Sequence, residues 1–338
     1  MARKPAVSAA LCLIFVILIW GMNWLVIKDA LQVAPPLFFT GLRLLGGAAA
    51  IAVARLALGY QLRIGDRGRL NLFAVGMLQM ACGLGLSLVG LQYLDIGRSA
   101  LIFYTMPLWL AIIEWVFDGR RQTGFELAAI ASGLGGIVLL SANGIGPTAA
   151  PMTFDNVEGV ALLLIAAICW ALGSWLANRS RSHVDVWSRT IFQLATSGMA
   201  VMMASAAIEP HFDVKYLSAL AVPIAFNCIV ATGLAFVAWY YALASIPARI
   251  ASQSLVLIPV VALTSAFILK GEELTLRTVL ACLLIIMSVT IVIWQREQQS
   301  SRGRVVRASF SPIDEADKPR ASVSRSGLSV EGSTHARR

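Results

Sequence analysis

Residues 104–123 read YTMPLWLAIIEWVFDGRRQT, and residues 256–275 read VLIPVVALTSAFILKGEELT. Both stretches have a proline fourth, a glycine sixteenth and a threonine last, so Pro107 matches Pro259 at a separation of 152 positions. Matches at one fixed separation are typical of an internal repeat. The rest of the chain can be tested for the same separation.

Upstream of these stretches the separation changes to 150. It relates Trp20 to Trp170, Arg43 to Gln193, and residues 83–84 to residues 233–234, both Gly-Leu. Each match is weak alone, but the constant separations indicate that the chain is two copies of one unit. We place the copies at residues 1–145 and 146–294, followed by a tail at 295–338.

The composition shows what kind of unit is repeated. Hydrophobic residues make up 58% of the 338 positions and charged residues 13%, whereas soluble domains are about 45–50% apolar and about 25% charged. Long continuous apolar stretches favour membrane-spanning helices over barrel strands. We predict ten spans, at about 7–27, 36–58, 70–92, 96–117, 125–142, 158–177, 187–208, 217–243, 247–269 and 275–294.

Five spans in each copy have a topological consequence. Because five is odd, the second copy enters the membrane from the opposite side. The predicted fold is therefore an all-α polytopic membrane protein, with ten transmembrane helices in two inverted five-helix repeats. Inverted repeats are the design of many secondary transporters, whose halves rock about a central binding site.

The charge distribution predicts the orientation. The net charge is +9, but a cytoplasmic N-terminus places twelve Lys and Arg residues in inside loops and five in outside loops, as the positive-inside rule requires. This accounts for the basic excess without nucleic-acid binding. The run after Arg3 and Lys4 has no small-residue cleavage site, so we interpret it as an uncleaved helix. Both termini are then cytoplasmic, in a bacterial inner membrane.

Cysteines and the tail carry little chemistry. None of the five cysteines forms a C-x-x-C pair, so we expect no disulfide framework, no metal site and no cofactor. Residues 295–338 are rich in Ser and Arg and are predicted to be a disordered cytoplasmic tail. A second interpretation is contact between residues 302–307 and anionic lipid head groups.

Several motifs resemble a known family. They are Trp20-Gly21-Met22-Asn23-Trp24, Gly41-Leu42-Arg43, Gly97-Arg98-Ser99-Ala100, Tyr104-Thr105-Met106-Pro107-Leu108-Trp109 and Lys270-Gly271-Glu272-Glu273-Leu274. Over residues 7–294 the chain resembles the drug/metabolite transporter superfamily, in its EamA-like exporter type. The resemblance implies an inner-membrane carrier, often an exporter of amino acids or other small metabolites. The Gly-Glu pair of the family is present at Gly271-Glu272, but the first half has Gly119-Arg120 at the matching place.

Aromatic residues in the matching first and sixth spans predict a cavity. Trp20, Asn23 and Trp24 are spaced i, i+3 and i+4 and share one helix face, as do Trp170 and Ser174. Ordinary packing or an interfacial aromatic belt is the alternative. Further candidates for the lining are Gln79, Tyr104, Thr105, Trp239, Tyr240, Ser252 and Gln253.

Arg43 is the most informative polar residue within a span. A charge in lipid costs at least about 2.5–3.5 kcal/mol at the centre, so the side chain must face protein or water. We expect either an anchor for a substrate carboxylate or a structural cation that pairs with helix-end carbonyls. Its repeat mate, Gln193, is neutral, which suits one anionic group bound away from the centre.

Three other residues in the spans have two interpretations each. Glu114 either carries a coupling proton, since burial raises the pKa of a carboxyl group, or is a rim acid paired with Arg120 or Arg121. Pro107 and Pro259 each remove a helix hydrogen bond and free a carbonyl, those of Phe103 and Leu255. They are either hinges beside the cavity or ordinary membrane-helix prolines.

Taken together, the sequence favours a secondary carrier that exports a small metabolite, such as an amino acid or another carboxylate, by alternating access. The partners expected are the substrate and the lipid bilayer, and glycine-rich helix faces permit a homodimer. An intramembrane enzyme is disfavoured, because neither H-E-x-x-H nor G-x-S-x-G occurs. A scaffold or receptor acting through the basic tail is the remaining alternative.

Overall fold

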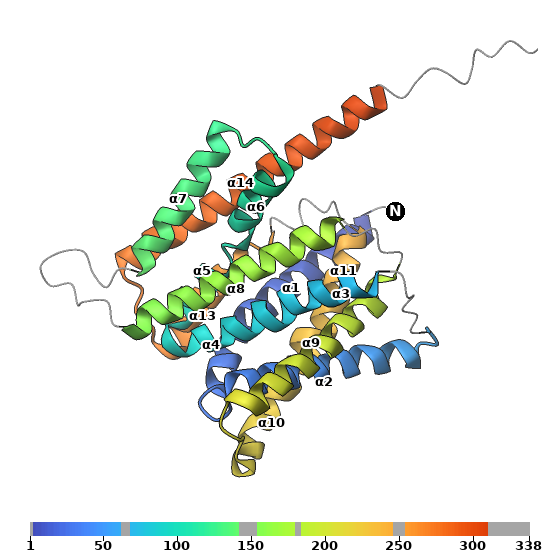
Figure 1. The fold of residues 1–338 in the computed structure, drawn as a ribbon, viewed down its shortest axis with the longest axis vertical. Helices are drawn as coiled ribbons and strands as arrows, with labels where there is room; N and C mark the ends of the chain where they lie inside the picture. The colour runs from blue at the N-terminus through green and yellow to red at the C-terminus, as the bar shows by residue number, and fades with distance from the viewer. Residues whose placement is uncertain (1–2, 62–67, 142–153, 180–183, 246–253, 310–338) are drawn as a thin grey trace, which may run out of the picture. The chain divides into compact units, whose positions relative to one another are not determined.

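The computed structural model describes residues 3–61, 68–141, 154–179, 184–245 and 254–309 (Figure 1). All regular secondary structure in these residues is helical, which confirms the predicted all-α class. Residues Met1–Glu297 form one compact unit, and Gln298–Arg338 form a second.

The first predicted half contains seven α-helices and one π-helix among its described residues. They are α1 (Arg3–Ala30), α2 (Pro36–Ala57), α3 (Arg69–Gly76), the π-helix η1 (Met77–Leu84), α4 (Gly85–Tyr93), α5 (Ile96–Phe103), α6 (Met106–Asp118) and α7 (Gly124–Ser141).

The second half follows the same order in its described residues. It contains α8 (Phe154–Arg179), α9 (Val186–Ile208), the short 3₁₀-helix η2 (Val214–Tyr216), α10 (Leu217–Ala225), the π-helix η3 (Phe226–Leu234), α11 (Ala235–Ser245), α13 (Leu257–Lys270) and α14 (Leu276–Ser309).

Eight helical segments of the described residues are long and apolar enough to cross a membrane. Two shorter apolar helices, Gly124–Leu140 and Leu257–Lys270, lie where the fifth and ninth spans are predicted. The ninth predicted span begins at residue 247, outside the described residues. The polytopic architecture is thus present, and the total of ten spans stays a prediction.

The helices α2 and α9 are repeat mates and lie side by side (Figure 1). Glu209, just after α9, accepts hydrogen bonds from the backbone N–H groups of Leu37 and Phe38 in the first turn of α2, at 2.7 and 2.9 Å. At the other end, Arg55 of α2 pairs at 2.6 Å with Asp185, which caps α9. The start of each helix therefore meets the end of the other. This antiparallel arrangement is what an inverted repeat requires.

Helices of the two halves interleave. In the first half, α1 packs against α11 and α13 of the second half, while α8 of the second half packs against η1, α4 and α6 of the first. The expectation that the two halves rock against each other stays a prediction. Moving one half away as a unit would separate α1 from α13 and α8 from η1, and both contacts are extensive.

Glycines permit these close crossings. A Cβ atom added at Gly21 of α1 would lie 2.6 Å from Cβ of Val261 and 3.0 Å from the carbonyl oxygen of Ile258, both on α13. One added at Gly173 of α8 would lie 3.2 Å from Cβ of Leu78. Small residues at helix crossings let backbones approach in lipid, where no hydrophobic effect drives the helices together.

The two prolines lie in the first turns of α6 and α13, where we expected each to remove a hydrogen bond within a helix. The fourth span is interrupted, because α5 ends at Phe103 and α6 begins at Met106, which places Pro107 in the first turn of α6. A proline there forfeits no helix hydrogen bond, since the first N–H groups of a helix have no partner within it. The carbonyl of Leu255, expected to lack a partner, accepts a hydrogen bond from the N–H of Ile258 at 3.1 Å.

The last helix continues past the predicted membrane boundary. α14 extends to Ser309, so residues 295–309 are helical where we predicted disorder, and residues 310–338 lie outside the described residues. Extending an existing helix avoids the cost of nucleation. Gln, Arg and Glu, which are frequent in residues 295–304, also have good helix propensity.

We predict that Gly21→Leu destabilises the protein more than Gly135→Leu. Overpacking at a close crossing typically costs about 1–3 kcal/mol, whereas no atom lies within 4 Å of a Cβ added at Gly135 of α7. Thermal unfolding of the purified protein in detergent, followed by tryptophan fluorescence, measures the difference. Equal melting temperatures for the two variants would contradict the close α1–α13 crossing.

Candidate functional site: a cavity between the two halves

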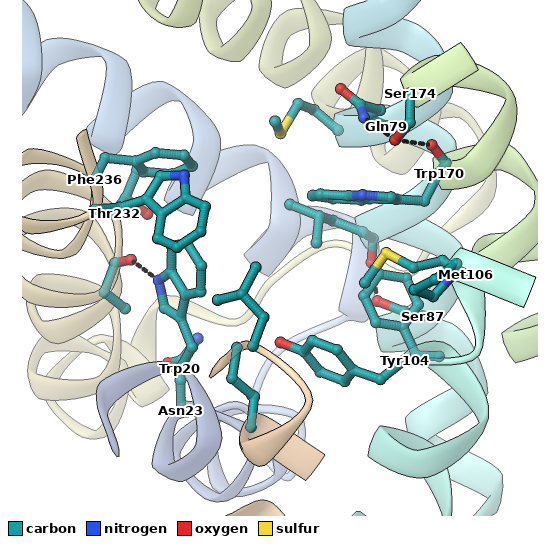
Figure 2. A pocket seen from close by; sticks show the side chains of 18 of the residues that line it. Trp20, Asn23, Gln79, Ser87, Tyr104, Met106, Trp170, Ser174, Thr232 and Phe236 are labelled. Carbon is teal, nitrogen blue, oxygen red and sulfur yellow. Dashed lines mark hydrogen bonds between the residues drawn. The ribbon is translucent and has the colours of Figure 1, made fainter. Parts of the chain in front are cut away.

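A cavity of about 740 Å³ lies between helices of both halves. Its lining includes residues of α1, α2 and α6 from the first half and of α8, α9 and α13 from the second. Figure 2 shows Trp20 and Phe236 on one side of this space, with Tyr104 and Trp170 on the other. The volume falls within the range of about 300–1,000 Å³ that is usual for small-molecule sites.

Aromatic rings form two groups on the cavity wall. Trp20 lies 5.7 Å from Phe236 and 6.1 Å from Trp239, measured between ring centroids. On the other side, Phe103 lies 5.9 Å from Trp24 and 5.8 Å from Trp170. Tilted and edge-to-face pairs at these distances are favourable and hold the rings in place. The cavity therefore offers preformed apolar surfaces to a bulky substrate.

Hydrogen bonds fix two of the tryptophan-bearing helices. The indole N–H of Trp20 donates to the carbonyl of Ala231 in η3 at 2.9 Å. Across the cavity, Nε2 of Gln79 in η1 donates to Oγ of Ser174 at 2.9 Å, and that hydroxyl donates to the carbonyl of Trp170 at 2.9 Å (Figure 2). The π-helix of each half therefore forms a hydrogen bond with the tryptophan-bearing helix of the other half, η3 with α1 and η1 with α8.

The two π-helices occupy matching positions in the repeat. Shifting η1 (Met77–Leu84) by 150 positions gives residues 227–234, nearly all of η3 (Phe226–Leu234). π-Helical segments are rare and occur frequently at functional sites. Both contribute to the lining, with Gln79 and Met80 from η1 and Ala231 and Thr232 from η3.

Arg43 lines the cavity, and its Nε atom is buried without a hydrogen-bond partner in the described part of the chain. Its repeat mate, Gln193, differs, because Nε2 of Gln193 donates to the carbonyl of Leu72 at 3.4 Å. A buried charged donor left unpaired costs more than about 1–3 kcal/mol. Arg43 is therefore suited to bind an anionic group that enters the cavity.

The charge of the lining has one sign. Among the described lining residues, Arg43 and Arg189 are basic, and none is Asp or Glu. The helices α6 and α13 also begin beside the cavity, at Met106 and Leu257, next to the lining residues Tyr104 and Val256. Helix N-termini carry partial positive charge, and interrupted membrane helices commonly present them to anionic substrates.

Most of the residues predicted from the sequence meet in this cavity. The lining contains these predicted residues: Trp20, Asn23, Trp24, Arg43, Gln79, Tyr104, Pro107, Trp170, Ser174, Gln193, Trp239 and Pro259. Ser252 and Gln253 lie outside the described residues, and the side chain of Tyr240 is not among those described. Whether these residues bind substrate stays a prediction.

Two predicted residues lie elsewhere. Thr105 is buried outside the lining, where its hydroxyl donates to the carbonyl of Ile102 at 2.6 Å and accepts from the indole of Trp109 at 3.2 Å. Glu114 is also outside the lining and pairs with Arg120 at 2.7 Å. The pair with Arg120 agrees with the rim-acid interpretation of Glu114, and the coupling-proton interpretation stays a prediction.

The sequence analysis missed several lining residues, notably Phe103, Phe236, Thr232 and Arg189. Phe103 and Phe236 are apolar and carry no signal that separates lining from packing. Arg189 is one of the twelve basic residues that the orientation argument assigns to inside loops. Its spacing of four from Gln193 is the signal that could have found it, because the two share one helix face.

The lining extends to one end of the bundle. Asn178, Arg189 and Ile293 belong to it, near the end of α8, the start of α9 and the membrane end of α14. We call this the N-terminal end, because α2 ends there, beside Asp185, and α1 therefore begins there. On α1 the described lining stops at Ile27, so it does not reach the opposite end of that helix at Ala30.

Charged contacts join the helices at the opposite end, which we call the Glu272 end. The carboxylate of Glu272 accepts hydrogen bonds from the N–H groups of Ile96 and Gly97 at the start of α5, at 2.7 and 3.1 Å. Lys28 donates to the carbonyls of Leu91 and Leu94, at 2.6 and 2.9 Å. The Glu272 contacts tie the second half to the first at this end, and the Lys28 contacts tie α1 to the end of α4 within the first half.

We predict that Glu272→Ala destabilises the protein and that Glu273→Ala does not. Loss of a carboxylate cap at a helix start costs about 0.5–2 kcal/mol, while Glu273 is exposed and carries the same charge one position away. Melting temperatures in detergent compare the two variants. A drop of equal size in both would show that charge at this end, rather than the cap on α5, is responsible.

The fold and the cavity together define a polytopic membrane carrier. The chain belongs to the EamA-like transporter family, whose family model matches it twice, at residues 7–142 and 157–294. The two matches correspond to the two halves described above.

Related proteins are named as transporters. The chain is 30% identical over 302 residues to a probable amino-acid metabolite efflux pump of Escherichia coli, covering 86% of this chain and 95% of that protein. It is 26% identical over 292 residues to the uncharacterized transporter YvbV of Bacillus subtilis, with coverages of 86% and 93%. The uncharacterized inner membrane transporter YedA of Escherichia coli is 29% identical over 277 residues, covering 81% of this chain and 87% of YedA.

A solved crystal structure shares the fold. It is 21% identical, has a TM-score of 0.58 and covers 86% of this chain and 98% of that one. Its likeness concerns the fold alone.

Proposed function

We propose that this protein exports a small metabolite that bears a carboxylate group, such as an amino acid, across a bacterial inner membrane by alternating access. Both termini are then cytoplasmic, and the N-terminal end of the bundle faces the cytoplasm. In the described conformation the cavity extends to that end. Substrate would enter there and leave after the Glu272 end opens.

The observation that carries the proposal is the unpaired Nε atom of Arg43 in a cavity whose described lining has no acidic residue. A carboxylate would complete the hydrogen bonding of this guanidinium and benefit from the starts of α6 and α13. A substrate with only a positive charge would meet two arginines and no described counter-charge. The cavity therefore favours anions and zwitterions over cations.

The aromatic walls support a substrate with an apolar part. Aromatic side chains of both halves face the cavity, and burying apolar surface contributes roughly 25 cal/mol per Å². Asn23 adds a buried oxygen, Oδ1, without a partner in the described structure, which suits the ammonium of a zwitterion. An amino acid offers both complementary groups.

Two observations support export and orientation. The excess of basic residues in loops at the N-terminal end favours a cytoplasmic location for that end, and one relative is named as an efflux pump.

Fusions of a fluorescent reporter or alkaline phosphatase after Glu297 test the orientation. Fluorescence without phosphatase activity is expected, and the reverse pattern would contradict a cytoplasmic C-terminal side.

We predict that Arg43→Gln selectively impairs transport of carboxylates. Three probes share one phenyl-ethyl frame: 3-phenylpropanoate carries the carboxylate, L-phenylalanine carries both charges, and 2-phenylethylamine carries the ammonium. Proteoliposome counterflow of the wild type should favour the first two. The variant should lose at least about tenfold in their transport, equivalent to about 1.4 kcal/mol, while Arg43→Lys retains part of it.

Arg121→Gln is the matched control, because Arg121 is exposed and lies outside the cavity lining. It should transport like the wild type. Equal losses for all three probes in Arg43→Gln would indicate a structural cation. Transport of 2-phenylethylamine as good as that of 3-phenylpropanoate by the wild type would contradict the proposed substrate class.

A further inference from the structure

We propose that Arg189 is a second anion-recognition residue, which captures the substrate carboxylate at the mouth of the cavity before the carboxylate reaches Arg43. The inference rests on the proposed function, since it assumes an anionic or zwitterionic substrate. It assigns a specificity role to a residue that neither the sequence motifs nor the family resemblance singled out.

Arg189 is placed at the entrance. It is the fourth residue of α9, it is partly exposed and it belongs to the cavity lining. Gln193, one turn deeper on the same face, also lines the cavity. With a rise of 1.5 Å per residue along the antiparallel helices α2 and α9, Arg43 lies roughly 15 Å deeper than Arg189. The two cations therefore stand in sequence along one path.

The nearby acid does not cancel the charge of Arg189. Oδ1 of Asp185 accepts hydrogen bonds from the N–H groups of Trp187 and Ser188, both at 3.1 Å, and pairs with Arg55 at 2.6 Å. Burial tends to raise the pKa of Asp185, but the bonds to Ser188 and the charge of Arg55 outweigh it and lower the pKa. Asp185 is thus ionised and already paired with one arginine.

Arg189 is the one charged residue among the described lining residues at the mouth. Because Asp185 is matched by Arg55 and Asp118 by Arg179, Arg189 and the N-terminal dipole of α9 add a positive potential there. A narrow entrance with low-dielectric walls focuses such a potential and raises the local concentration of anions. Capture at the mouth follows from this focusing and depends on ionic strength.

Comparison of the two repeats shows that the arginine at the mouth has no counterpart at the matching position near the Glu272 end. The residue that matches Arg189 at a separation of 150 is Phe39 on α2, which is fully buried in the apolar core. The Glu272 end therefore has no equivalent cation at this position. We expect the wild type to have a lower KM at the N-terminal end than at the Glu272 end, with a compensating difference in maximal rate.

The test uses Arg189→Gln in inside-out membrane vesicles, with 3-phenylpropanoate as the probe at low and high salt. Because the Debye length falls from about 30 Å at 0.01 M to about 3 Å at 1 M, the effect should be largest at low salt. We expect a KM increase of about three- to tenfold near 0.01 M, shrinking to less than twofold near 1 M. The maximal rate should change less than twofold.

Three comparisons make the outcome decisive. Arg189→Lys should keep a low KM, and Arg121→Gln, which removes one exposed charge outside the lining, should match the wild type. An unchanged KM in Arg189→Gln at low salt, with active wild-type transport, would overturn the role of Arg189 alone. Absence of carboxylate transport by the wild type would overturn the proposed function, and the inference with it.

Discussion

The arrangement depends on carboxylates that bind the exposed N–H groups at helix starts. Backbone groups in a membrane have no water to pair with, so helix ends near the bilayer need protein partners. Glu209 binds the start of α2 and accepts a further hydrogen bond from Ser205 of α9. Asp185 caps α9 and is held by Arg55, and Arg55 and Ser205 occupy matching repeat positions. At each end of the α2–α9 pair a carboxylate thus binds the start of a helix. Glu209 is held by Ser205 at one end, and Asp185 is held by Arg55 at the other.

This pairing has consequences for transport. Since α1 packs on α13 and α8 on η1, a motion of one half as a unit has to break these contacts or slide along them. The interruptions before Pro107 and Pro259, together with the two π-helices, lie along the cavity at matching positions. They are places where a helix can change direction without losing an extended run of hydrogen bonds. Among the described lining residues Arg43 is the one deep cation, so the cavity is asymmetric within this symmetric frame.

The sequence predicted which residues line the cavity better than it predicted the hydrogen bonds that join the helices. Constant separations paired Trp20 with Trp170 and Arg43 with Gln193, and all four line one cavity. Thr105 was misplaced because the helix breaks at that residue and turns the hydroxyl towards the carbonyl of Ile102. The cap that Glu272 forms on α5 joins residues 176 positions apart. Such pairing depends on tertiary packing and has no local pattern.

We propose that the cavity binds a carboxylate at Arg43 between aromatic walls of both halves. Anomalous scattering from crystals soaked with 3-(4-bromophenyl)propanoate tests it most directly. We predict a bromine peak within the cavity, among the rings near Trp170 or Trp20, with the carboxylate density in contact with the guanidinium of Arg43. Bromine bound only outside the cavity, or a carboxylate that points away from Arg43, would contradict the account.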